Sequence, residues 1–394
     1  MAQRHLDPTD PTAAGPVAVD ALAGYLRAQA TEFLRALRLH RETGGGAAGG
    51  GEESVAAARA LRRAARRISG TLHTFRPLLD ETWAEELRPE LAWLSGTLAR
   101  EHAYQARLER LLRALHRLSP PTDVPEPTPG SRASPGAERL GGTPRAARVG
   151  DGGAPARVRP SVGEAPGTAG TVPHPPAPTP DRGNGNLTVG AAKAGALLDR
   201  RLTLARARAH STALQALGSS RFHAVADKVA VLAGDVPLTP TAHTMVPRTL
   251  ATDAEERLAD AVAALPLVTA GSPYNAAALV HGLSPDPSPH PQDAPWHQVR
   301  LLLRLHRYAQ EALRPVDGEG APVDVRLLTA GRALDRHRDA SEAAAAAAAA
   351  ARTPRIAPAT AYALGVLHAD QRHEVEAARF AFQQAWQTQA IGAN

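Results

Sequence analysis

Cationic side chains recur on one line of a leucine-rich segment, WHQVRLLLRLHRYAQEAL, at residues 296–313. They are His297, Arg300, Arg304 and Arg307, in steps of three, four and three residues. On a helical wheel of about 100° per residue, this spacing gathers them on one narrow side together with Glu311. Arginine has a planar fork that binds carboxylate or phosphate oxygens two at a time, so the line predicts recognition of an anion.

The other positions of this segment, Leu301 and Leu305 among them, are mostly apolar, which predicts packing on more than one side. An arginine without a partner in a dry interior is costly, so the cationic line must face water, acids or a bound anion. Glu311 can pair with Arg307, but no nearby acid serves Arg300 or Arg304. A solvated face with extended arginines is the alternative interpretation.

A second cationic line lies in residues 54–75, which have the period of an amphipathic helix. The apolar stripe consists of Leu61, Ala65, Ile68, Leu72 and Phe75. The opposite side carries Arg59, Arg62, Arg63, Arg66 and His73, with no acid in the segment to pair with them. Arg59, Arg62 and Arg66 repeat the spacing of the first line from His297 to Arg304. We therefore expect a duplication whose two cationic helices line one basic groove.

The composition favours helices as the elements that position these side chains. Aromatic residues make up only 4% of the 394 residues and alanine is abundant, which predicts close-packed helices rather than sheets. The absence of cysteine excludes disulfides and thiolate metal sites. The net charge of +6 favours anionic partners. Lys193 and Lys228 are the only lysines, so this charge is almost all arginine.

Changes in composition divide the chain. We expect a disordered tail at 1–16, a first helical half at 17–118, a disordered Pro/Gly-rich linker at 119–187 and a second helical half at 188–391. The glycine-rich run after Thr43 predicts a flexible linker. The further expected helices begin with a segment capped by Asp20, and include 83–87, 91–118, 189–217, 220–233, one started by Asp293 and Pro295, an alanine run at 343–351 and a closing helix at 360–386.

Four segments of the sequence resemble the CHAD family, the conserved histidine alpha-helical domain. RALRRAARRISGTLHTFRPLLD and LRPELAWLSGTLA resemble its opening helices, WHQVRLLLRLHRYAQEAL resembles the matching helix of its second half, and ALGSSRFHAVADKVAVLAGDVPLTP resembles its middle. The resemblance covers roughly Val17 to Trp386 apart from the linker. It implies an all-α fold of two helical bundles related by pseudo-twofold symmetry, with a basic channel that binds inorganic polyphosphate.

The resemblance also implies the site residues. The polyphosphate-binding candidates are Arg59, Arg62, Arg63, Arg66, Arg67, His297, Arg300, Arg304, Arg307 and His337. Arg59 stands in the histidine place of the first motif and Ser69 where an arginine is expected, while Leu301 and Leu305 replace residues that are often basic. The chain is therefore similar to a thinned member of the family.

No catalytic machinery is visible, because no Walker loop, nucleophile elbow or paired-carboxylate site stands out. The segment HEVEA at 373–377 lacks the second histidine of a zinc site, so we expect no metal and no cofactor. No apolar run is long enough to span a membrane, which predicts a cytoplasmic protein without a membrane partner.

Three hypotheses for function remain. The first is non-catalytic binding of inorganic polyphosphate, including association with polyphosphate granules. The second is nucleic-acid binding through the same arginines, which the scarcity of aromatic side chains near the basic helices disfavours. The third is a degenerate CHAD-like scaffold for a protein partner, whose signature would be a channel filled by internal acids.

Overall fold

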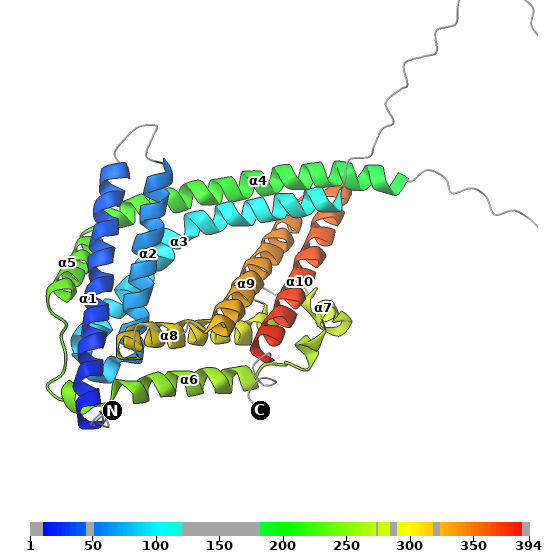
Figure 1. The fold of residues 1–394 in the computed structure, drawn as a ribbon. Coiled ribbons are helices and arrows are strands. Elements are labelled where there is room, and N and C mark those ends of the chain that lie inside the picture. Colours follow the sequence, from blue (N-terminus) through cyan, green and yellow to red (C-terminus); the bar gives the residue numbers. More distant parts are fainter. Residues whose placement is uncertain are drawn as a thin grey trace, which may run out of the picture. The chain divides into compact units, whose positions relative to one another are not determined.

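The structure, a computed structural model, describes residues 11–44, 51–119, 182–272, 275–283, 290–317 and 324–387. These residues form α-helices with short turns and 3-10 helices between them, and they contain no β-strand (Figure 1). The helices are α1 Pro11–Gly44, α2 Gly51–Thr74, α3 Glu81–Leu118, α4 Arg182–Leu217, α5 Ser220–Gly234, α6 Pro247–Ala263, α7 Ala276–Gly282, α8 Ala294–Asp317, α9 Val325–Ala351 and α10 Pro358–Gln387. The expected all-α fold is confirmed.

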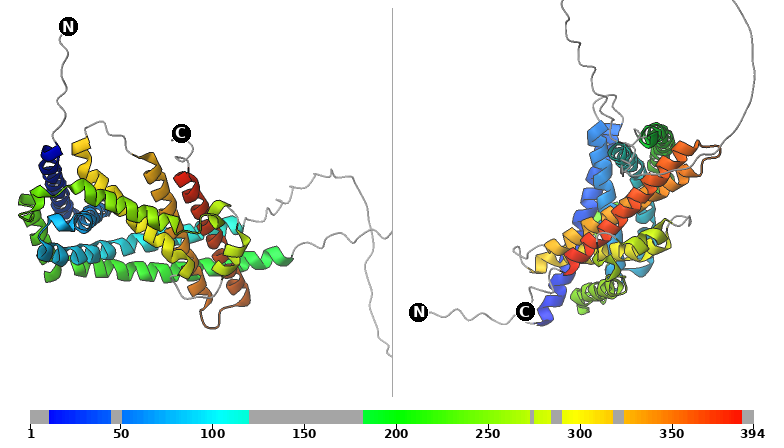
Figure 2. Two further views of the ribbon diagram at one scale, coloured as in Figure 1. Left: turned by 90° about the horizontal axis from the view of Figure 1, so that it is seen from below. Right: turned by 90° about the vertical axis from the view of Figure 1, so that its right-hand side faces the viewer.

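The two halves of the sequence repeat one order of elements. In the first half α1 packs on α2, and in the second half α6 packs on α8. Each pair is followed by two long helices that lie side by side, α3 with α4 and α9 with α10 (Figures 1 and 2). The two cationic helices, α2 and α8, occupy equivalent places and contact each other. This arrangement is the one expected from the duplication.

Three groups of buried apolar side chains hold the helices together. One joins α1, α2, the start of α3, α5 and the end of α8, with Phe33 and Phe75 fully buried. A second joins the end of α3 with α4, α9 and α10, largely through alanine and leucine. The third joins α6, the start of α8, α9 and α10 around Trp296 and Phe382. Alanine at these contacts allows close approach of the helix backbones, as the composition predicted.

Several helices begin with acidic residues that favour the start of a helix. In α2, Glu52 and Glu53 lie in the first turn, where carboxylates interact favourably with the helix dipole. Every residue of its predicted apolar stripe is at most 1% exposed. Helix α3 begins after Asp80, whose side chain accepts a hydrogen bond of 2.8 Å from the backbone N–H of Trp83. Helix α9 begins after Asp324, whose carboxylate accepts from the N–H groups of Arg326 and Leu327.

Several predicted boundaries were wrong. Helix α1 begins at Pro11, so part of the expected 1–16 tail is helical and Asp20 lies inside the helix rather than at its cap. The predicted segments 83–87 and 91–118 form one helix, α3, that continues through Pro89. Helix α4 begins at Arg182, inside the expected linker. Residues 1–10, 45–50 and 120–181, which hold the rest of the predicted tail and linkers, lie outside the described residues.

The prediction that α8 is buried on most sides was partly wrong. Val299, Leu303 and Leu313 are buried, but the side of the helix that carries Leu301 is open, and Leu301 is 48% exposed. Among the helices described, none is both long and apolar enough to cross a lipid bilayer.

Candidate functional site

The two cationic helices cross where a glycine faces an aromatic ring. A Cβ atom on Gly70 of α2 would lie 2.6 Å from Cδ2 of Tyr308 on α8, which is closer than carbon atoms can approach. Only glycine therefore permits this crossing. Arg66 lies one turn before Gly70, and Arg304 lies one turn before Tyr308. The close crossing thus brings the two arginine lines to the same place.

Five arginines from three helices form an arginine cluster, defined as Arg62 and Arg66 of α2, Arg300 and Arg304 of α8, and Arg338 of α9. Burial and, after it, the charges of the other four members together lower the pKa of Arg62 from 12.5 to about 10. Burial is likewise the main cause that lowers the pKa of Arg66, Arg300 and Arg304. These guanidinium groups repel one another in a partly dry place, which favours an anion between them.

Asp335 of α9 supplies one carboxylate to this cluster. Its Oδ1 accepts a hydrogen bond of 2.7 Å from Nε of Arg300 and lies 3.8 Å from Nη2 of Arg304. Burial raises the pKa of Asp335, but the charge and hydrogen bond of Arg300 outweigh this effect and keep its pKa below the usual range. The prediction that Arg300 and Arg304 lack a nearby acid was therefore wrong, because their partner comes from another helix.

Arg62 and Arg66 form no ion pair with any residue that the structure describes. The Nε atom of each is buried and has no hydrogen-bond acceptor. Neither arginine lies deep enough to be fully enclosed, since both side chains are half-buried. They are therefore cations that have lost part of their hydration without gaining a counter-ion.

A second carboxylate, Glu311 of α8, holds two other predicted site residues. Its Oε2 accepts a hydrogen bond of 2.8 Å from Nε of Arg67, and its Oε1 lies 3.9 Å from Arg307. The hydroxyl of Tyr25 donates to the same carboxylate at 3.1 Å, which joins α1 to this contact. The Glu311 side chain is only 19% exposed, so Arg67 and Arg307 are tied to an internal partner.

Two cavities of about 510 Å³ each flank the arginine cluster. The first, which we call the α8 cavity, lies between α2, α3 and α8, and Arg66 and Arg304 line it with Leu301 and Leu305. The second, the α9 cavity, lies between α2, α3 and α9, and both Arg62 and Arg338 line it. The cluster is thus accessible from two sides.

The α9 cavity is much more basic than the α8 cavity. Besides Arg62 and Arg338, its lining includes four arginines of α3, which are Arg100, Arg107, Arg110 and Arg113. Its acids are Asp339, which pairs with Arg338, and Glu342, which pairs with Arg107. Basic side chains outnumber acidic ones here, so this cavity retains a positive field.

The sequence did not single out the arginines of α3 or Arg338. The α3 arginines recur in steps of seven, three and three residues, which places them on one helix face and could have been recognised. Arg338 lay next to the candidate His337, and a one-residue step turns a helix by about 100°. This step points Arg338 to the cavity and His337 into the interior.

The remaining candidates lie away from the arginine cluster. Arg59 and Arg63 are exposed on α2. Burial is the main cause that lowers the pKa of His102, and the charge of Arg59 is the second cause. Burial is the main cause that lowers the pKa of His297 below its usual 6.5, and the charges of Arg300 and Arg338 contribute, so this ring is largely neutral at pH 7.

His337 is 1% exposed and contacts neither cavity. Its ring stacks on Trp296 at 5.6 Å between centroids, and Arg379 donates to its Nε2 at 3.3 Å. Burial, reinforced by the charge of Arg379, lowers the pKa of His337 to about 3. The side chain is a neutral part of the interior, and of the other candidates it contacts His297, whose ring centroid lies 5.5 Å from its own.

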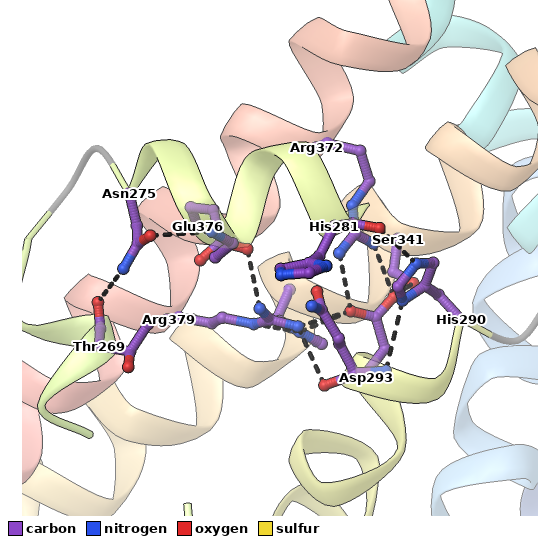
Figure 3. A network of polar contacts seen from close by, with 12 residues as sticks. Thr269, Asn275, His281, His290, Asp293, Ser341, Arg372, Glu376 and Arg379 are labelled. Carbon is purple, nitrogen blue, oxygen red and sulfur yellow. Dashed lines mark hydrogen bonds and ion pairs between the residues drawn. The ribbon is translucent and has the colours of Figure 1, made fainter. Parts of the chain in front are cut away.

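A buried polar network surrounds Asp293, which the sequence predicted as the cap of α8. Its carboxylate instead accepts hydrogen bonds from Ser341 of α9 and from Arg372 and Arg379 of α10 (Figure 3). Burial alone would raise the pKa of Asp293, but the hydrogen bond and charge of Arg372 lower it to about 2. Glu376 accepts from Arg379 at 2.8 Å. These charges satisfy one another and pin α9 and α10 to the start of α8.

Comparison with known proteins identifies relatives of the chain. A family model described as the CHAD domain matches residues 28–348, a range that includes both cationic helices. Among solved structures, PptA from Streptomyces chartreusis is similar, with 63% sequence identity and a TM-score of 0.67. The match covers 94% of this chain and 99% of that chain. A search of the curated proteins finds no match.

Proposed function

The chain belongs to the CHAD domain family, and from this premise we propose that it binds inorganic polyphosphate, without converting it chemically, at the arginine cluster. The resemblance of the sequence to this family implies polyphosphate as the ligand. The single observation that carries the proposal is the state of Arg62 and Arg66. Both are half-buried, neither has an acidic partner among the described residues, and each has a buried Nε without an acceptor.

A phosphate group fits this need better than a carboxylate would. Each guanidinium can donate two parallel hydrogen bonds to phosphate oxygens, and a polyphosphate chain carries one negative charge on each internal phosphate, so it presents many charges in series. The ligand would offset the burial and the mutual repulsion that lower the pKa values of Arg62, Arg66 and Arg304. The gain in free energy on binding is therefore greatest at the arginines whose charge is least favourable in the free protein.

The two cavities support a polymer rather than a single phosphate. A chain that contacts Arg62 and Arg338 in the α9 cavity is next to Arg66 and Arg304, which line the α8 cavity. The α3 arginines extend the basic lining of the α9 cavity farther from the cluster. A linear polyanion could therefore contact basic side chains on both sides of the crossing.

Binding without catalysis is part of the proposal. The carboxylate that lies at the cluster, Asp335, is paired with Arg300, and its lowered pKa makes it a weak base. Association with polyphosphate granules in the cytoplasm follows from the same proposal, because the ligand is the material of such granules.

Isothermal titration calorimetry with long-chain sodium polyphosphate tests the proposal. The variant Arg62→Met with Arg66→Met keeps the apolar stems and removes the two unpaired charges. We expect this variant to lose at least an order of magnitude in affinity, since each phosphate contact is charge-assisted. A charge-matched control, Arg35→Met with Arg38→Met, alters α1 side chains that are 71% and 82% exposed and should bind as the unaltered protein does.

The salt dependence of the same titration gives a second measurement. By analogy with nucleic acid, a polyanion that contacts about six to ten arginines binds with a steep dependence on salt concentration. The slope of log affinity against log salt should become shallower by roughly one for each contacting arginine removed. No heat at low salt, or equal affinity in the two double variants, would contradict the proposal.

Titration with single-stranded RNA of matched charge distinguishes the nucleic-acid hypothesis. One tyrosine lines each cavity: Tyr308 is 9% exposed and packs against Gly70, and the ring of Tyr104 is covered by Arg107 at 5.5 Å, so a stacking base would have to compete with these contacts. We therefore expect polyphosphate to displace RNA and RNA to displace polyphosphate poorly. If neither polymer binds, the scaffold hypothesis takes their place.

A further inference from the structure

Three of the carboxylates that pair with arginines, those of Asp293, Glu311 and Asp335, differ in how much of the side chain is exposed and in how many partners it has. The Asp293 side chain is completely buried and bonded to two arginines and a serine. Glu311 is 19% exposed and bonded to Arg67 and Tyr25. The Asp335 side chain is 54% exposed, although it pairs with two members of the arginine cluster, Arg300 and Arg304.

Only one of the two carboxylate oxygens of Asp335 makes these contacts. Both Nε and Nη2 of Arg300 approach the same oxygen, Oδ1, at 2.7 Å and 2.6 Å, and Arg304 approaches that oxygen as well. A forked pair, in which each nitrogen takes its own oxygen, would be stronger. The carboxylate is half exposed and can turn to water, whereas the Arg300 side chain is only 15% exposed and needs an anion in place of the carboxylate.

The position of Asp335 is where the two arginine lines meet. It pairs with Arg300 and Arg304 of α8, and its charge also reaches Arg66 of α2. Close approach of the backbones sets this position, because a Cβ on Gly331, one turn earlier in α9, would lie 3.2 Å from Leu303 of α8. A phosphate that contacts Arg300 and Arg304 together would occupy the place of this carboxylate.

We propose that Asp335 is a tethered counter-ion of the free site, which the ligand displaces from Arg300 and Arg304, and that it excludes orthophosphate while admitting a polymer. This inference rests on the proposed function and adds its selectivity. A tethered carboxylate has a local concentration on the order of millimolar or more, so a free phosphate ion must compete with it. A polymer that is already bound to Arg62 and Arg66 also has a high local concentration near Arg300 and Arg304, so it can displace the carboxylate from them.

The variant Asp335→Asn tests the displacement. If the carboxylate leaves Arg300 and Arg304 on binding, its removal affects the free protein and leaves the complex unchanged. The free protein should then become less stable in urea unfolding, and the affinity for long-chain sodium polyphosphate should rise by the same factor, about fivefold. If the carboxylate kept its arginine partners in the complex, its removal would destabilise both states, and the affinity would not rise by the factor that corresponds to the loss of stability.

Direct titration with sodium orthophosphate tests the selectivity. Orthophosphate should bind the Asp335→Asn variant about fivefold more tightly than it binds the unaltered protein, because no carboxylate competes with it. Asp335→Glu, which keeps the charge, should restore the resistance to orthophosphate. Asp370→Asn is a matched control, because Asp370 pairs with Arg117 at 3.0 Å and lines neither cavity.

The outcomes separate this inference from the proposed function. If polyphosphate binds neither the unaltered protein nor the variants, the proposed function fails. If polyphosphate binds the unaltered protein but Asp335→Asn changes neither the affinity nor the effect of orthophosphate, the inference about Asp335 fails alone. An equal response of Asp370→Asn would also overturn it, since the effect would then come from net charge.

Discussion

Replacement of Arg62 by methionine should raise the free energy of unfolding of the ligand-free protein. Burial and the neighbouring arginines lower the pKa of Arg62 from 12.5 to about 10, which corresponds to roughly 3 kcal/mol of unfavourable interaction with the charge. The side chain remains partly exposed, so solvent screening reduces this value to about 1 to 2 kcal/mol. Arginine stays protonated at ordinary pH, so the folded protein retains this cost.

Urea unfolding with and without long-chain sodium polyphosphate measures the effect. Arg62→Met should unfold at higher urea concentration without ligand, and the added polymer should stabilise it less than it stabilises the unaltered protein. Arg63→Met is the matched control, because Arg63 is the next residue of the same helix and is exposed. A lower stability of Arg62→Met without ligand would refute the reasoning, since the guanidinium would then be a structural contact.

Three further predictions concern the framework of the site. Because the pKa of His337 is about 3 in the folded protein and near 6.5 when unfolded, stability should fall by up to about 1.4 kcal/mol per pH unit as the pH drops below 6.5. Urea unfolding at pH 7 and pH 4.5 should show a smaller fall for His337→Gln, and an equal fall would contradict this. Asp293→Asn leaves two buried arginines without their shared counter-ion and should lower the free energy of unfolding by about 3 to 5 kcal/mol, measured by thermal unfolding. A decrease below about 1 kcal/mol would show that the network contributes little to stability. Gly70→Ala should cost about 1 to 3 kcal/mol and weaken polyphosphate binding, because its Cβ meets Tyr308, whereas Gly96→Ala, with no atom within 4 Å, should not destabilise.

The helices themselves could be predicted well from the sequence. The apolar stripe of α2 and the alanine run of α9 lie where periodicity and composition placed them. The repeated spacing of Arg59, Arg62 and Arg66 with the α8 line correctly predicted that these helices meet, because similar sequences in a duplicated chain take equivalent places. These features are local, or are repeated locally, and can be recognised within one segment.

The partners of the arginines could not be predicted in the same way. Glu311 and Arg67 are separated by 244 residues, and Arg300 and Asp335 by 35, so no spacing within a helix indicates either pair. Asp293 has the sequence context of a helix cap, but three side chains from distant helices compete for its carboxylate. Tertiary contacts thus determined which arginines have an acidic partner, and among the half-buried arginines of the predicted lines Arg62 and Arg66 form no ion pair with a described residue.

The arginine cluster is assembled from parts of the chain that are far apart in sequence. Arg62 and Arg66 precede Arg300, Arg304 and Arg338 by more than 230 residues. During translation α2 therefore emerges from the ribosome long before α8 and α9, and until then it is an isolated basic helix. If the proposed function is correct, a nascent chain that ends before α8 lacks the cluster arginines of α8 and α9 that would contact polyphosphate.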